Sequence, residues 1–204
     1  TQDLELIISD DGSTDSTIGL VEKILDDRIK IIRHKNTGKG GAVRRGVELA
    51  SKEFVLFMDA DNSASVDQLE RFISYIEHFD VIIGSRESSG GDIERDEENH
   101  RKITGRIFNF FVQKVLNLSI YDTQCGFKLF KSSVAKNLFE LSKEEGFVFD
   151  VEILFLAKRM DRLIKEVGIN WFKSDKTSVS LVKDGISMFY SIFKIKRRWS
   201  KYEF

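Results

Sequence analysis

The sequence lacks several features that would assign it to a class at once: it has one cysteine, no proline and a net charge of −1. The single cysteine, Cys125, excludes an internal disulfide and is typical of a protein from a reducing compartment. The 32 basic and 33 acidic residues give no reason to expect a nucleic-acid partner. No apolar run reaches the ~18–20 residues of a transmembrane helix, and no signal peptide is visible. What remains is a chain of 204 residues, enough for one domain with a sizeable core.

Short apolar segments alternate with longer amphipathic ones along the chain. Buried strands are predicted at 4–9, 29–34, 54–59, 80–85, 126–130 and 163–169, and helices at 16–25, 39–50, 66–77, 100–116, 133–141 and 151–160. This alternation indicates an α/β fold with a mainly parallel sheet and helices on both faces. Ser65 and Gln68 form a capping-box pattern for one of these helices. Ligands bind beyond the carboxyl ends of the strands in such sheets, where the clusters DDGS, DADN and GSR fall.

The segment VLFMDADNSAS ends a predicted strand on two carboxylates. Asp59 and Asp61 are two residues apart, so both side chains point to the same side of an extended chain. Paired carboxylates suit a hard divalent cation, Mg²⁺ or Mn²⁺, which also takes phosphate oxygens. The alternative is that these residues only form a turn and cap the next helix.

Two polar turns earlier in the chain allow both a binding and a structural role. In DDGSTD, Asp10 or Asp11 is a candidate acceptor for a nucleobase or ribose, although both residues also suit a turn. In NTGKGGAVRRG, backbone amides at a helix start and Lys39 are candidates for phosphate binding. The turn is not a Walker A loop, and Val43 replaces the third glycine of a dinucleotide-binding fingerprint.

Charged residues in the middle of the chain supply further candidates. Arg86 follows a predicted strand and Arg101 begins a helix, so either could bind an anion as a planar fork, or lie in solvent. Asp122, Asp150 and Glu152 lie among apolar residues and are candidates for binding substrate hydroxyls or transferring protons, or else for helix caps.

The C-terminal segment, 184–204, mixes aromatic residues with lysine and arginine. Such a helix can lie on an anionic membrane surface or pack against the core. The first case predicts a peripheral protein on the cytoplasmic face of a membrane, and the second a soluble cytoplasmic one.

An ordered set of motifs resembles the inverting glycosyltransferases of the GT-A fold, glycosyltransferase family 2. The set comprises DDGSTD, N-x-GKG-x-AV-x-x-G, DAD, GSR, R-x-x-x-x-R-x-FN, DTQCGFKLF, F-x-FDVE and EV-x-INW. DTQCGFKLF and FDVEILFLA are most similar to dolichyl-phosphate β-glucosyltransferases, and next to dolichyl-phosphate mannose synthases. The resemblance implies a catalytic domain at 1–183 that lacks the family's first strand, so the chain is expected to be a fragment.

The resemblance also implies the donor side of the site. Asp10 and Asp11 match positions that contact the nucleobase and ribose. Asp59 and Asp61 match the metal-binding D-x-D, in which Mg²⁺ or Mn²⁺ bridges the donor diphosphate. Asp61 is the expected direct ligand, and Asp59, which is nearer the strand, either joins it or faces the ribose instead. Ser63 stands where the mannose synthases have a third metal ligand.

On the acceptor side, the resemblance implies that Arg86 and Arg101 hold the lipid phosphate and the donor phosphates. Asp122, Asp150 and Glu152 match the region that recognises the sugar. The implied reaction transfers a hexose, glucose from UDP-glucose first, to a polyprenyl or dolichyl phosphate. The alternatives are mannose transfer from GDP-mannose, transfer to a sugar or protein hydroxyl, and a non-catalytic nucleotide-sugar or membrane-binding module.

Overall fold

The computed structural model describes residues 3–86, 99–172 and 183–202. Its elements, in chain order, are β1 (Leu6–Asp10), α1 (Thr17–Val21), β2 (Ile29–Arg33), α2 (Lys39–Leu49), β3 (Phe54–Met58), η1 (Val66–Tyr75), β4 (Val81–Ser85), α3 (Asn99–Leu116), β5 (Phe127–Lys131), α4 (Ser132–Leu141), α5 (Phe149–Arg159), β6 (Ile164–Gly168) and α6 (Lys183–Trp199). Every predicted strand and helix therefore has a counterpart, and most differ only at the ends; the helix predicted at 16–25 is shortened to Thr17–Val21, and the one predicted at 66–77 is a 3₁₀ helix.

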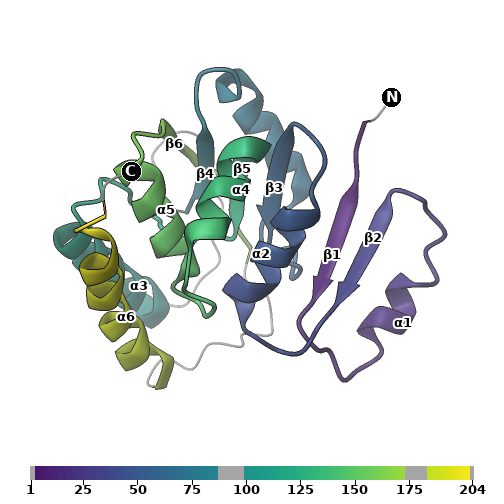
Figure 1. Cartoon of the computed structure of the whole chain (residues 1–204), viewed down its shortest axis with the longest axis horizontal. Coiled ribbons are helices and arrows are strands. Elements are labelled where there is room, and N and C mark those ends of the chain that lie inside the picture. Colours follow the sequence, from purple (N-terminus) through teal and green to yellow (C-terminus); the bar gives the residue numbers. More distant parts are fainter. Residues whose placement is uncertain (1–2, 87–98, 173–182, 203–204) are drawn as a thin grey trace.

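The strands form two sheets. β1 and β2 are parallel partners, and the larger sheet has the order β3-β5-β4-β6. In the larger sheet β5 runs antiparallel to both neighbours, whereas β4 and β6 are parallel. Figure 1 shows the β1–β2 pair to one side of the larger sheet, and α2 packs against β1. The α/β architecture is confirmed, but the expected single, mainly parallel sheet is in detail one parallel pair and one mixed sheet.

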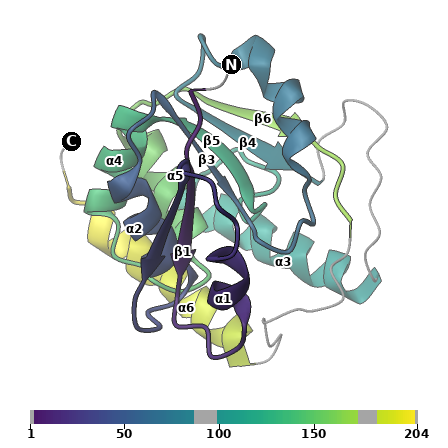
Figure 2. The same cartoon turned by 90° about the vertical axis from the view of Figure 1, so that its right-hand side faces the viewer.

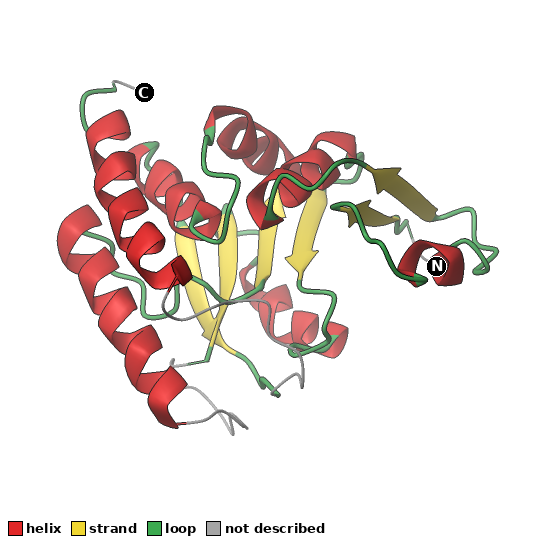
Figure 3. Cartoon of the chain, turned by 90° about the horizontal axis from the view of Figure 1, so that it is seen from below, coloured by secondary structure: helices red, strands yellow, loops and turns green. Residues whose placement is uncertain are grey.

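Helices cover both faces of the larger sheet, as Figure 3 shows. Alternate residues of β4 enter two cores, because successive side chains of a strand point to opposite faces. Val81 and Ile83 lie in the larger core with α3, α4, α5 and α6. Ile82 lies in the smaller core with Phe72 of η1 and Phe127 of β5. Apolar side chains thus cover both faces of the larger sheet.

The helix after β3 differs from the prediction. η1 is a 3₁₀ helix, and Ser65 makes no side-chain capping hydrogen bond. The hydroxyl of Ser65 donates to Asp67 instead, and the Gln68 side chain accepts from the Asn170 amide. The capping-box prediction is therefore wrong: Gln68 joins η1 to the chain beyond β6.

The C-terminal helix α6 packs on the core. Its Ile192, Ile195 and Trp199 are buried in the larger core, and the helix lies against α3 and α5. Figure 2 shows α6 and α3 together on one side of the molecule. The packing predicted for the C-terminal segment is thus present, and its outer side chains are still exposed to solvent.

Candidate active site

The polar ends of β1 and β3 meet through the glycine turn that begins α2. Asp11 follows β1, and its carboxylate accepts the amide hydrogens of Thr37 and Gly38, both at 2.8 Å. Gly38 has a φ of 95°, a conformation that favours glycine. The Nδ1 atom of His34 lies 3.2 Å from the same carboxylate. Asp11 therefore holds the start of α2 in a fixed position next to β1.

The amides of this turn are largely used by the protein itself. Besides the two amides bound by Asp11, those of Gly40 and Gly41 donate to the carbonyl oxygen of Glu145, at 2.6 and 3.2 Å. A side chain on Gly40 would collide with this segment, because a Cβ there would lie 2.6 Å from the Glu144 oxygen. The turn thus presents the Lys39 side chain as its positively charged group.

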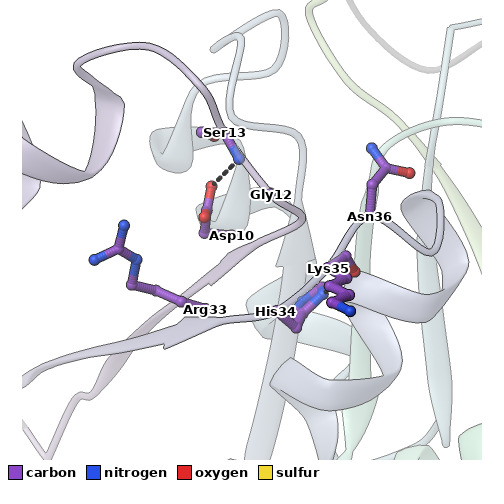
Figure 4. Close-up of a pocket in the computed structure, with 7 residues that line it drawn as sticks. All are labelled: Asp10, Gly12, Ser13, Arg33, His34, Lys35 and Asn36. Carbon is purple, nitrogen blue, oxygen red and sulfur yellow. Dashed lines mark hydrogen bonds between the residues drawn. The ribbon is translucent and has the colours of Figure 1, made fainter.

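A cavity of about 460 Å³ opens at the ends of β1 and β2. Figure 4 shows the seven residues that line it: Asp10, Gly12, Ser13, Arg33, His34, Lys35 and Asn36. The Asp10 carboxylate accepts the Ser13 amide at 3.1 Å. Hydrogen bonding to Ser13 holds the pKa of Asp10 below its ordinary value, so this carboxylate is ionised at neutral pH. The cavity offers carboxylate, amide and cationic groups to a polar ligand.

Asp59 lies directly beyond β3 and binds the Lys39 ammonium with both carboxylate oxygens. The Nζ atom is 2.8 Å from Oδ1 and 3.0 Å from Oδ2. The Asp59 amide donates to the Gly126 carbonyl oxygen at 2.9 Å. A Cβ on Gly126 would lie 2.0 Å from the Asp59 carboxylate, so only glycine fits there. β5 thus fixes the carboxylate from one side and α2 supplies its counter-ion from the other.

Asp61 and Ser63 complete the D-x-D segment. The Asp61 carboxylate accepts the Ser63 amide at 3.0 Å, and Asn62 between them adopts a φ of 56°. The Ser63 hydroxyl is buried and has no hydrogen-bond partner among the described residues. The described residues contain no cluster of three or more His, Cys, Asp or Glu side chains arranged as a metal cage. Two carboxylates and a free hydroxyl fit a cation such as Mg²⁺ or Mn²⁺, which fills its remaining positions with water and phosphate.

A fully buried ion pair lies behind Asp59. The Lys128 ammonium, in β5, is 2.5 Å from the Asp150 carboxylate in the first turn of α5, and also donates to the Cys125 carbonyl at 2.5 Å. The two side chains are 1% and 2% exposed. Burial raises the pKa of Asp150, and the charges of Lys128 and Lys39 partly oppose that rise. The pair therefore joins the D-x-D region to the core.

Arg86 and Asp122 form a second, bidentate pair beyond β4. The Arg86 Nε and Nη2 atoms donate to the two Asp122 oxygens at 2.8 and 2.9 Å, and the Arg86 amide donates at 2.9 Å. The guanidinium lies 5.5 Å from the Trp171 ring. Glu166 accepts the Tyr121 and Asp122 amides. Although burial opposes it, Arg86 holds the pKa of Asp122 below its ordinary value.

Glu152 accepts hydrogen bonds from the segment after α4 and from the C-terminal helix. Its fully buried carboxylate accepts the amides of Lys143 and Glu144, each at 2.7 Å. It also accepts from Arg198 at 2.6 Å and from the Trp199 ring nitrogen at 2.7 Å. Two of these four bonds tie α5 to the segment that follows α4, and the other two tie α5 to α6.

The predicted residues therefore fall into separate groups. Asp59 meets Lys39 at the end of β3, and Arg86 meets Asp122 at the end of β4. Arg101 lies in the first turn of α3, and its side chain is outside the described part of the structure. Lys128 was not predicted, although a lysine between apolar residues of a buried strand is a signal for a paired charge.

Comparisons with known proteins agree with this geometry. Residues 1–139 match the family model described as Glycosyl transferase family 2. The chain is 36% identical over 96% of its length to the dolichyl-phosphate beta-glucosyltransferase of Dictyostelium discoideum, covering 63% of that protein. It is 35% identical over 90% of its length to the Saccharomyces cerevisiae protein of the same name, covering 61% of it. The chain thus spans about three fifths of the length of these curated relatives.

Solved structures give the same fold. The chain covers 69% of a glucosyl-3-phosphoglycerate synthase from Mycobacterium tuberculosis, crystallised with Mn²⁺, UDP-glucose and glycerol 3-phosphate. The match covers 96% of this chain with a TM-score of 0.64 at 18% identity. A mannosyl-3-phosphoglycerate synthase from Rubrobacter xylanophilus matches 95% of this chain and 62% of its own, with a TM-score of 0.66 at 16% identity. The GT-A fold expected from the motifs is confirmed.

Proposed function

Because the chain belongs to glycosyltransferase family 2, we propose that it transfers glucose from UDP-glucose to a polyprenyl phosphate such as dolichyl phosphate. The relatives from Dictyostelium and yeast are dolichyl-phosphate beta-glucosyltransferases, which supports this choice of acceptor and sugar. The structural neighbour crystallised with UDP-glucose supports the choice of donor.

The observation that carries the proposal is that both candidate bases, Asp122 and Asp150, are bound by positively charged side chains. Asp122 is bound by Arg86, which holds its pKa below the ordinary value, so this carboxylate is a poor general base. Burial raises the pKa of Asp150, but its side chain is 2% exposed and bound by Lys128, so it is closed off from an acceptor hydroxyl. An acceptor hydroxyl needs a base, whereas a phosphate monoester, with a second pKa near ~6, is already ionised at neutral pH. The arrangement therefore favours a phosphate acceptor.

Each candidate residue would have its own role in the proposed transfer of glucose. Asp10 lines the cavity that would take the nucleoside, and Arg86, oriented by Asp122, would hold a phosphate. An oxygen of the acceptor phosphate attacks the anomeric carbon as the bond from that carbon to the nucleoside diphosphate breaks. Asp59 and Asp61 would hold Mg²⁺ or Mn²⁺. When bound, this ion would offset the negative charge of the leaving diphosphate.

A surface formed by α3 and α6 would meet the membrane. It exposes the apolar side chains Ile107, Phe110, Phe111, Tyr190 and Phe193. The rings of Phe111 and Phe193 are 5.9 Å apart, so the two helices present one continuous patch. Basic residues of the last turn of α6 follow it. Apolar and basic side chains together suit an anionic cytoplasmic leaflet. None of the described helices has the length and apolar character needed to cross a bilayer.

The direct test incubates the protein with radiolabelled UDP-glucose, Mn²⁺ and dolichyl phosphate and then extracts the lipid. We expect a labelled glycolipid that depends on the metal, and little product from GDP-mannose. A product from GDP-mannose alone would assign mannose as the sugar. Transfer to a soluble sugar without any lipid product would refute the phosphate acceptor. Absence of Mn²⁺-dependent UDP binding in calorimetry would support a non-catalytic module.

Replacing each carboxylate by its amide separates the two acceptor classes. If a carboxylate is the base for a hydroxyl acceptor, Asp122→Asn or Asp150→Asn abolishes turnover at saturating substrate. For a phosphate acceptor, at least one of these variants retains turnover, and Asp122→Asn mainly raises the KM for the lipid because Arg86 loses its orientation. Circular dichroism checks that each variant is folded.

A further inference from the structure

The Lys39 ammonium occupies the place on Asp59 where a metal ion would bind. Its Nζ atom lies within 3.0 Å of both carboxylate oxygens, so it uses the lone pairs that a cation would need. A divalent ion and the ammonium are both positive, and each repels the other at such distances. A cation that used both Asp59 oxygens would therefore have to displace the ammonium from them.

Several contacts hold the Lys39 ammonium near Asp59. The negative charges of Asp150 and Asp61, together with that of Asp59, attract it electrostatically. The ammonium also lies 5.4 Å from the centre of the Phe57 ring, a favourable cation–π distance. These contacts stabilise the ion pair when no ligand is present.

The same lysine is placed to reach a phosphate. It is the first residue of α2, the helix end at which anions are stabilised, and its side chain is 26% exposed. The amides of Thr37, Gly38, Gly40 and Gly41 already donate to Asp11 and Glu145. The flexible Lys39 side chain is therefore the donor of this turn that can change partner.

We propose that Lys39 is an internal counter-ion of Asp59 that gives up this carboxylate to a divalent cation when a nucleoside diphosphate takes the ammonium. The proposal rests on the metal-dependent function proposed above. It makes metal and nucleotide binding cooperative: the metal alone has to break the Lys39–Asp59 pair, whereas the nucleotide offers the ammonium a new partner. The coupling is reciprocal, so the metal strengthens nucleotide binding by the same factor.

The experiment measures Mn²⁺ affinity without any turnover, from the electron paramagnetic resonance signal of free Mn²⁺, with and without UDP. In the unaltered protein we expect UDP to tighten Mn²⁺ binding by about tenfold, an ordinary coupling strength. Lys39→Met should bind Mn²⁺ alone about tenfold more tightly, because no ammonium competes, and UDP should then tighten Mn²⁺ binding by a smaller factor than in the unaltered protein. Lys39→Gln provides a second, polar variant.

Lys131→Met is the matched control. Lys131 also pairs with an aspartate, Asp80, at 3.1 Å. Lys131 lies opposite Phe54 at the start of β3, whereas the D-x-D segment follows the other end of that strand. This variant should leave both Mn²⁺ affinities unchanged. Equal Mn²⁺ affinity of Lys39→Met and the unaltered protein, or equal coupling to UDP in both, would overturn the counter-ion role alone. Absence of Mn²⁺ binding in every protein, with or without UDP, would overturn the metal-dependent function as well.

Discussion

The buried pair of Lys128 and Asp150 should be one of the most sensitive points of the fold. Lys128→Met keeps most of the side-chain volume but leaves the Asp150 carboxylate, 2% exposed, without its ammonium partner. Breaking a buried ion pair from one side typically costs about 3–5 kcal/mol. For a chain of 150–250 residues, 1 kcal/mol changes the melting temperature by about 2–4 °C, so the expected loss is roughly 6–20 °C.

The stability lost in the Lys128→Met variant should depend on pH. Lys128 is the strongest influence that opposes the burial-driven rise in the Asp150 pKa, so its removal raises that pKa further above the ordinary 3.8. A folded-state pKa above the unfolded value means that the folded form binds a proton more tightly. Stability is then lost as the pH rises above 3.8. The cost of Lys128→Met should therefore be smaller at pH 5 than at pH 8.

Urea unfolding followed by circular dichroism at both pH values measures these effects. The double variant Lys128→Met with Asp150→Leu removes both charges, and should recover most of the lost stability, because apolar replacement of a whole buried pair is often neutral. Lys131→Met, which breaks a more exposed pair, should cost about 1 kcal/mol or less. A single Lys128→Met variant as stable as the unaltered protein, or a double variant less stable than the single one, would refute the reasoning.

Three further predictions concern the site, the first sheet and the C-terminal helix. Gly126→Ala should push the Asp59 carboxylate away, since a Cβ would lie 2.0 Å from it, and should lower Mn²⁺ affinity in the presence of UDP while circular dichroism stays unchanged. Glu5→Gln should abolish a loss of stability between pH 4.5 and about 2, because hydrogen bonding to Lys30 lowers the Glu5 pKa from 4.5 to about 2; identical acid unfolding curves would contradict this. Glu152→Gln should destabilise the fold by at least about 2 kcal/mol, because four donors lose a charged acceptor. Faster tryptic release of the C-terminal segment would accompany that change, and unaltered cleavage would argue against it.

The sequence predicted the elements well because their apolar periodicity is strong. The five residues of β4 are all buried, and in the sequence they stand as the apolar run Val81–Ile83 followed by Gly84 and Ser85. Strand pairing was harder to predict, because β5 runs antiparallel between β3 and β4. A buried strand has the same composition in either direction, so periodicity does not distinguish the two.

The sequence indicated which charged residues are candidates for the site, but it did not indicate which residues they contact. Asp122 and Arg86 are 36 residues apart, and nothing in the spacing indicates that one holds the other. Glu152 illustrates the same limit: an acidic residue beside a site motif suggests substrate binding, whereas its four hydrogen-bond donors come from the segment after α4 and from α6. Only the packing of distant helices decides which carboxylates face the ligand and which face the protein.

The polar groups behind the D-x-D segment form one series of alternating charge. Asp61 and Asp59 lie near Lys39, whose charge also acts on Asp150, which in turn is paired with Lys128. Carboxylates and ammonium groups therefore largely compensate one another before any ligand arrives. A divalent cation alone would add positive charge to a compensated cluster, and a diphosphate alone would add negative charge. The two together nearly cancel, so the cluster as a whole favours their joint binding, for the same reason that Lys39 is expected to couple them.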